Sequence, residues 1–173
     1  EWLAGFVEKF LGADHIVPPT VLREVDGQTG SVQAWVEGAP ISRAADWSAD
    51  INQDDLQYIA VIDWLLANGD RHRENFFVGK EGHAYAIDHG FILPLRQESK
   101  LRSFPLRFFS NQDLSPRVLE TLKRASSSDA GMHMVEDAFA FIFGQNSGVA
   151  KSILDRFKIR LAELVEMKKF PDY

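Results

Sequence analysis

Two carboxylates and one amide near the middle of the chain are the groups that phosphoryl transfer needs. Asp70 and Asn75 lie within residues 68–75, and Asp88 follows thirteen residues after Asn75. Divalent ions that neutralise phosphates are held by oxygen ligands, and a further carboxylate can orient an acceptor hydroxyl and accept its proton. Asn75 and Asp88 suit the role of metal ligands, and Asp70 suits the role of the base.

A β-hairpin is expected to bring these three side chains together. The Gly-Lys-Glu-Gly sequence at 79–82 predicts a turn between strands at 75–78 and 83–87, with Val78 paired to His83 and Phe77 to Ala84. In this arrangement Asn75 and Asp88 lie at the open end of the hairpin, near the loop that carries Asp70. The spacing therefore predicts one cluster of oxygen ligands.

The remaining patterns predict a mixed α and β fold. Helical periodicity marks residues 2–11, about 54–68, 116–124, 134–143 and 149–168. Asp54 or Asp55 can cap the second of these helices, and Gly69 is expected to end it. A further hairpin is expected with strands at 21–25 and 31–37, and the polar stretch after Gly38 predicts a boundary between two lobes.

Composition narrows the class of protein. The chain has 173 residues, 45% of them hydrophobic, with no cysteine and a formal net charge of -6. Its acidity disfavours nucleic acid as a partner, because that affinity comes largely from clustered Lys and Arg. No apolar run approaches the roughly 20 residues that span a bilayer, so we expect no transmembrane segment and leave peripheral membrane contact open. Cytoplasmic location is the default expectation for a chain without cysteine.

Structural roles are the alternative interpretation of the same residues. Asp70 and Asn75 could simply form a loop, and Asp88 could cap a turn, as isolated Asp and Asn usually do. Their joint spacing favours the chemical role. Two other functions stay open: a module that binds partners without catalysis, and a metal-dependent hydrolase, which is weakened because a single His lies in the cluster. His83 and His133 have no partner at metal-ligand spacing.

Residues 68–75 and 87–90 resemble the catalytic loop and metal-binding segment of the phosphatidylinositol 3- and 4-kinases, and most of all the type II phosphatidylinositol 4-kinases. Residues 17–20, 30–38, 62–68 and 103–109 resemble further segments of that family in the same order, so that the similarity covers about residues 1–116. The resemblance implies a protein-kinase-like α+β fold. Residues 1–38 would form the remnant of a small lobe, which consists of a helix and a β-hairpin, together with the hinge. Residues 39–173 would form a mainly helical large lobe that contains a catalytic hairpin.

The resemblance also implies roles for individual residues. Asp70 would be the catalytic base, and Asn75 and Asp88 would hold Mg²⁺. The adenine of ATP would meet the backbone around Gln33, Ala34, Trp35 and Val36. Trp35 could stack on the base or pack in the hinge, and the two are equally supported. Arg71 and His72 could touch phosphate or acceptor, although Arg71 can equally anchor the loop through a carboxylate, and Asp63 is expected to be a buried structural partner of that loop.

Some elements of the family pattern are absent from the sequence. No small-lobe Lys and no Gly-rich loop can be found, and Glu1 stands about where the helix Glu that binds the Lys would lie. We therefore expect an N-terminally truncated kinase whose parent transfers the γ-phosphate of ATP to a hydroxyl of a lipid or protein. This piece could itself be inactive, and a catalytically inactive pseudokinase is the alternative.

Overall fold

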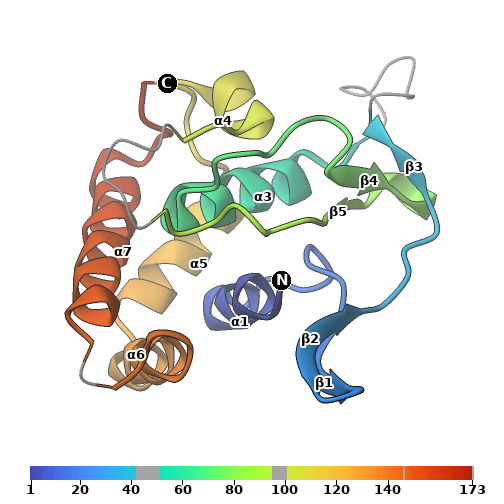
Figure 1. The fold of residues 1–173 in the computed structure, drawn as a ribbon. Coiled ribbons are helices and arrows are strands. Elements are labelled where there is room, and N and C mark those ends of the chain that lie inside the picture. The colour runs from blue at the N-terminus through green and yellow to red at the C-terminus, as the bar shows by residue number, and fades with distance from the viewer. Residues whose placement is uncertain (42–50, 95–100, 146, 173) are drawn as a thin grey trace.

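The computed structural model describes residues 1–41, 51–94, 101–145 and 147–172. The chain forms helices and two small antiparallel sheets, which is the mixed α and β class that the sequence predicts. The two sheets lie toward the right of Figure 1, and α5, α6 and α7 lie toward the left. The elements in chain order are α1 (Trp2–Leu11), β1 (Thr20–Val25), β2 (Gln28–Gln33), β3 (Ala39–Pro40), α3 (Gln53–Leu66), β4 (Phe76–Val78), the 3₁₀ turn η2 (Lys80–Gly82), β5 (Ala84–Ala86), α4 (Phe104–Phe109), α5 (Pro116–Ser126), α6 (Asp129–Phe143) and α7 (Gly148–Met167).

Helix α3 lies at the centre and packs against α1, α4, α5 and α7 (Figure 1). Ile59, Ile62 and Leu65 are fully buried, because apolar residues occupy most of its circumference and every side meets another element. Helix α1 buries a single face and ends at Gly12, whose φ of 70° is a left-handed cap that costs glycine little. Among the described helices, none combines the length and apolarity needed to cross a lipid bilayer.

The cap and the end of α3 differ from the prediction. Asn52, rather than Asp54 or Asp55, caps the helix by accepting hydrogen bonds from two backbone N–H groups of the first turn. The helix ends at Leu66, because Ala67 takes a left-handed conformation with φ of 50°. The loop toward Asp70 therefore begins earlier than the position of Gly69 indicates.

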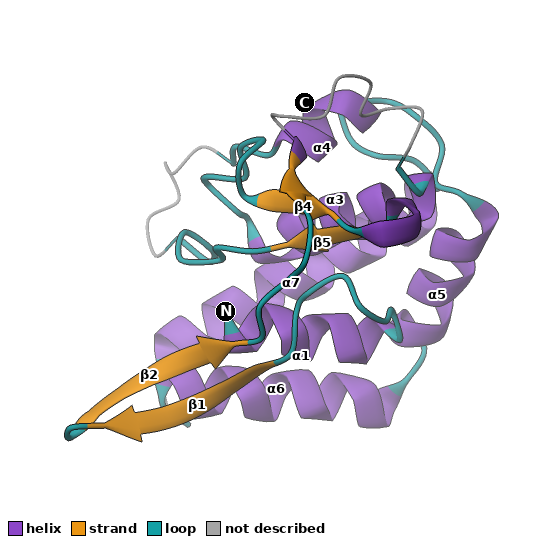
Figure 2. Ribbon diagram, turned by 90° about the vertical axis from the view of Figure 1, so that its right-hand side faces the viewer, coloured by secondary structure: helices purple, strands orange, loops and turns teal. Residues whose placement is uncertain are grey.

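The first hairpin, β1–β2, forms as predicted but with a different second strand. Asp26 and Gly27 both have positive φ, 52° and 75°, and Val25 pairs with Gln28. An Asp-Gly pair suits such a two-residue turn, so the second strand begins at Gln28 instead of Ser31. Figure 2 shows this hairpin extending away from the helices.

The hairpin of β4 and β5 belongs to a three-stranded sheet with the order β3-β4-β5. Its register differs from the prediction by one residue: Val78 pairs with Ala84, Phe77 with Tyr85 and Phe76 with Ala86. The turn is tighter than expected because Gly79 and His83 close a three-residue turn in which Glu81 is left-handed. Strand β3 pairs antiparallel with β4, and just before it the chain approaches this hairpin so closely at Gly38 that an added Cβ would lie 2.5 Å from the Val78 carbonyl oxygen.

Glu8 of α1 fixes the segment that leads from α1 toward β1. Its buried carboxylate accepts hydrogen bonds from the backbone N–H groups of Ile16 and Val17. Burial raises the pKa of Glu8 to about 7, although those two hydrogen bonds favour the ionised form. The folded chain therefore holds a proton on Glu8 more tightly than the unfolded chain does.

We expect Glu8→Gln to change how stability depends on pH. As the pH rises from about 4.5 to about 7, Glu8 progressively destabilises the folded wild type. The reason is that its carboxyl group ionises at a lower pH in the unfolded chain than in the folded chain. Glutamine keeps the accepting oxygen but cannot ionise. Between pH 4.5 and pH 8, the unfolding free energy of the variant should gain about 3 kcal/mol relative to wild type. Urea unfolding at both values measures this, and a difference independent of pH would contradict it.

Candidate active site

A buried ion pair holds the loop that follows α3. The Arg71 Nε atom lies 3.2 Å from both carboxylate oxygens of Asp63, and both side chains are almost completely buried. Asn68 Nδ2 and Ser103 Oγ donate to the same carboxylate at 3.0 and 2.8 Å. This confirms Asp63 as the buried partner of the loop, and it gives Arg71 the anchoring role that was one of its two alternatives.

Backbone hydrogen bonds attach the same loop to the segment before α4. The Arg71 N–H donates to the Arg102 carbonyl at 2.8 Å, and the Arg71 carbonyl accepts from the Phe104 N–H at 2.9 Å. Helix α4 follows directly, with Ser103 as its cap and Pro105 in its first turn. No helical pattern in the sequence marks this short helix, although its bounds fall within the apolar run to Phe109.

Asp70 is half-buried, and its backbone is fixed on both sides. The Asp70 N–H donates to Asn68 Oδ1 at 2.9 Å, and the Asp70 carbonyl accepts from Asn75 Nδ2 at 3.0 Å. Asp70 is one of the residues that line a cleft. Asn75 therefore contacts the backbone of the residue that the sequence predicts to be the base.

Asp88 lies at the same end of the β4–β5 hairpin as Asn75. The Ile87 N–H donates to the Asn75 carbonyl at 3.0 Å, and Arg71 Nη1 donates to the carbonyls of both Asn75 and Ile87. The backbone of Asn75 and that of the residue before Asp88 thus lie side by side despite the shifted register, while the meeting of the three side chains expected from the sequence stays a prediction. Asp88 is exposed and has a φ of 55°, a left-handed conformation that Asp tolerates better than most residues.

Glu1 lies against the segment that carries Asp88. Its carboxylate accepts from the His89 N–H at 2.6 Å, from His89 Nδ1 at 3.0 Å and from Gln33 Nε2 at 3.1 Å. Burial by itself would raise the pKa of Glu1, but the hydrogen bonds from His89 outweigh it and hold the pKa at about 2. Burial and the nearby Arg71 charge lower the pKa of His89. A neutral imidazole therefore donates to an ionised carboxylate.

The residues predicted to bind adenine begin at Gln33, the last residue of β2, and continue after the strand. The Ala34 N–H donates to the Pro19 carbonyl at 2.8 Å, and Trp35 is 88% exposed. Packing of Trp35 in a hinge, one of its two alternatives, is thus not found within the described chain. A cleft of about 410 Å³ is lined by Glu1, His89 and Gly90 together with residues 29–31 of β2, and residues 33–36 are not part of its described lining. An exposed indole is available to a planar ligand, and nucleotide binding here stays a prediction.

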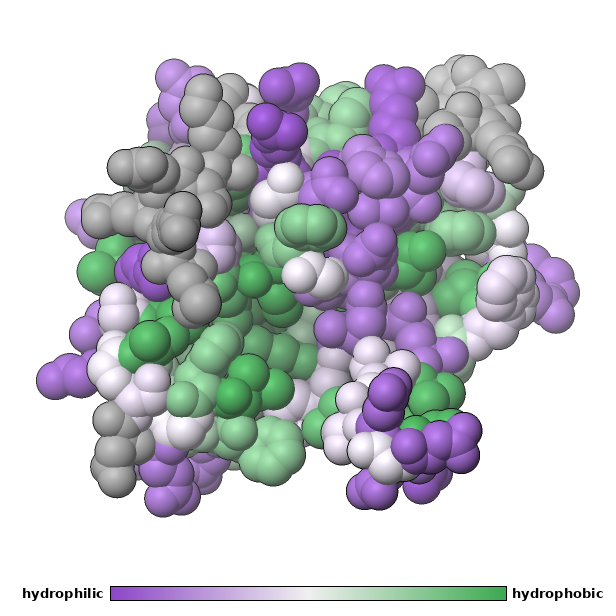
Figure 3. Space-filling model, in the orientation of Figure 1, coloured by the Kyte–Doolittle hydropathy of each residue, from purple (hydrophilic) through white to green (hydrophobic). Residues whose placement is uncertain are grey.

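Arginines surround Asp70 in a cleft of about 560 Å³. Its described lining includes Arg71, Arg73, Arg102 and Arg107, together with His72, and Asp70 is the one carboxylate among these lining residues. Hydrophilic residues cover this part of the surface, over α4 and the α3–β4 loop, whereas hydrophobic residues gather over α1 and α6 (Figure 3). Arg102 and Arg107 were not identified from the sequence, because the net charge of the whole chain is negative and does not report that basic residues gather at this cleft.

The sequence places the chain in a known family. The model of the phosphatidylinositol 3- and 4-kinase family matches residues 31–121, more than half of the chain. The chain therefore belongs to the phosphatidylinositol 3- and 4-kinase family. The matched residues include Asp70, Asn75 and Asp88, and the mixed α and β fold is consistent with a kinase-like architecture.

A relative from Mycobacterium tuberculosis (strain ATCC 25618 / H37Rv), Protein Rv2133c, is similar over part of the chain. The two are 28% identical over 123 residues, and the match covers 51% of this chain and 44% of that protein. This chain therefore matches less than half of the length of that relative.

Proposed function

We propose that this chain carries the reaction centre of a Mg-ATP-dependent phosphotransferase that transfers the γ-phosphate of ATP to a hydroxyl. Membership of the kinase family supports phosphotransfer as the class of reaction. The observation that carries the proposal is the contact of Arg71 Nη1 with the carbonyls of both Asn75 and Ile87, because it supports convergence of Asn75, Asp88 and Asp70.

Each residue has a specific role in this mechanism. Asn75 and Asp88 would supply oxygen ligands to Mg²⁺, which neutralises charge on the phosphates. Asp70 would orient the acceptor hydroxyl and accept its proton as the oxygen attacks phosphorus and the bond to the leaving ADP oxygen breaks. Asn68 and Asn75 hold the backbone of Asp70, so its carboxylate needs little rearrangement before the reaction.

The arginine-rich cleft favours an acceptor that carries negative charge. Arg102 and Arg107 line the cleft with Asp70, and guanidinium groups bind phosphate and carboxylate well. A phosphorylated lipid headgroup or an acidic segment of a protein has this chemistry. The same proposal includes a likeness to the type II phosphatidylinositol 4-kinases. It also assigns residues 1–38 to the small lobe and hinge, and residues 39–173 to the large lobe.

The test is metal-dependent binding of ATP, measured by calorimetry with and without Mg²⁺. Asp88→Asn should weaken Mg-dependent ATP binding at least about 10–100-fold, the cost typical of disturbing the outer partners of a metal ligand. Asn also tolerates the left-handed conformation at this position. Asp155→Asn, on the exposed face of α7, is the matched control and should bind as wild type does.

Two results would contradict the proposal. One is Asp88→Asn binding Mg-ATP as tightly as wild type. The other is the absence of Mg-dependent binding both in this chain and in a longer version with flanking sequence. Binding that is insensitive to Mg²⁺ would instead support the alternative of a nucleotide-binding module without catalysis.

A further inference from the structure

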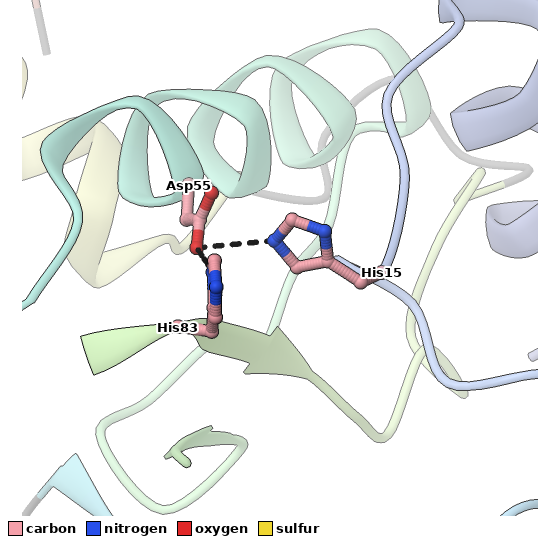
Figure 4. Close-up of side chains that lie close together, drawn as sticks. All are labelled: His15, Asp55 and His83. Carbon is pink, nitrogen blue, oxygen red and sulfur yellow. Dashed lines mark hydrogen bonds and ion pairs between the residues drawn. The ribbon is translucent and has the colours of Figure 1, made fainter. Parts of the chain in front are cut away.

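Two histidines and an aspartate meet at a second cluster, which the sequence analysis did not find. His15 lies between α1 and β1, Asp55 in the first turn of α3, and His83 immediately before β5. His15 Nε2 lies 3.3 Å and His83 Nδ1 3.1 Å from the same oxygen of Asp55. Figure 4 shows both imidazoles directed at this carboxylate. His83 therefore has partners, 28 and 68 residues away in the chain.

The backbone holds each of the three residues in place. Next to His15, the Ile16 carbonyl accepts from the Ala86 N–H at 2.7 Å, which joins this segment to β5. The His83 carbonyl accepts from the Gly79 N–H at 2.9 Å. The Asp55 oxygen that faces both rings also accepts from the Ala84 N–H at 3.1 Å. The cluster is therefore formed by the fold before any ligand arrives.

Two of the three spacings in the cluster are close to those of a tetrahedral metal site. Zn²⁺ binds imidazole nitrogen and carboxylate oxygen at about 2.0–2.2 Å, so ligand atoms around it are roughly 3.3–3.5 Å apart. The two distances to Asp55 are close to this, and all three ligand atoms lie within 4.8 Å of one another. The rings are little more than one third exposed while Asp55 is buried, so that water can reach the side of the cluster opposite the carboxylate.

We propose that His15, Asp55 and His83 bind one divalent transition-metal ion, best Zn²⁺, with water as the fourth ligand. Two imidazoles and one carboxylate suit Zn²⁺, whereas Mg²⁺ prefers oxygen ligands. Each neutral ring would turn its unprotonated nitrogen to the metal and keep its proton on the other nitrogen. The ion would join the α1–β1 segment to α3 and to the catalytic hairpin.

Hydrogen bonding alone is the competing explanation, because a carboxylate can accept from two neutral imidazoles without a metal. Zn²⁺ titration by calorimetry at neutral pH, with thermal unfolding in parallel, separates the two. We expect one ion per wild-type chain and a higher Tm with Zn²⁺. His83→Ala should weaken binding by more than about 100-fold, since losing even an outer partner of a ligand costs about 10–100-fold.

His133→Ala is the matched control, because His133 is an exposed histidine of α6 that pairs with Glu136 outside the cluster. It should bind Zn²⁺ as wild type does. Co²⁺ in place of Zn²⁺ should give the absorption of a tetrahedral site, and His15→Ala should remove that absorption. If His83→Ala does not fold, His15→Ala replaces it in the Zn²⁺ titration. Stoichiometric binding that survives in His83→Ala or His15→Ala, or no binding by wild type, would overturn the proposal. This test does not depend on ATP binding or phosphotransfer.

Discussion

Replacing Asp70 by Asn is expected to lower kcat for phosphotransfer about 10²–10⁴-fold, the usual contribution of a general base. The amide is similar in size and cannot accept the proton of the acceptor hydroxyl. The Asp70 N–H donates to Asn68 and the Asp70 carbonyl accepts from Asn75, and neither hydrogen bond involves the altered carboxylate, so the loop should keep its shape. Initial rates at saturating ATP, with an anionic hydroxyl acceptor, measure the effect.

Nucleotide affinity distinguishes this chemical effect from a structural one. Asp70→Asn should bind Mg-ATP about as tightly as wild type, since Asn75 and Asp88 are the proposed metal ligands. Asp155→Asn, which changes an exposed residue of α7, should keep full activity. Wild-type kcat in Asp70→Asn would exclude Asp70 as the base.

The largest loss of stability is expected for Asp63→Ala. Arginine side chains stay charged in proteins. Without Asp63, the buried guanidinium of Arg71 would lose the carboxylate that balances its charge. Asn68 and Ser103 would lose their acceptor as well. Breaking a buried pair by removing one partner typically costs about 3–5 kcal/mol. Urea unfolding at pH 7 would show this as a lower midpoint.

Two further variants serve as controls for the loss of stability in Asp63→Ala. Asp63→Asn keeps the volume and one accepting oxygen, so its loss should be smaller than that of Asp63→Ala. Asp155→Ala removes an exposed carboxylate and should change stability by no more than about 0.5 kcal/mol. If Asp63→Ala also lowered the unfolding free energy by no more than about 0.5 kcal/mol, the ion pair would not be what holds the loop.

Much of the helical architecture could be predicted from local sequence. The apolar stripe of residues 2–11 and the stop at Gly12 match α1, and the three C-terminal helices lie close to their predicted positions. α6 begins at Asp129, five residues earlier than expected, because Ser128 caps it ahead of the apolar run. Helix α4 was harder to define because six residues are too few to display a helical period.

Strand pairing and long-range clusters were predicted less well. The turn at Gly79 to Gly82 could close in two registers that differ by one residue, and the sequence does not distinguish them. Asn75 and Asp88 were nevertheless placed at the same end, because either register leaves both there. His15 and Asp55 are 40 residues apart, and contacts at such separation depend on tertiary packing that no local pattern reports.

The Asp63–Arg71 pair also bears on how this loop can move. Its hydrogen bonds reach the end of α3, the open end of the β4–β5 hairpin and the start of α4. Swinging the loop outward as a lid would expose or separate a buried cation and its counter-ion, and would break those bonds together. In the proposed reaction, an acceptor would therefore approach a surface that is already shaped, and closure over the proposed nucleotide would have to come from another part of the molecule. Substrate positioning would then draw on rigidity established during folding, and little ordering entropy would be lost in each turnover.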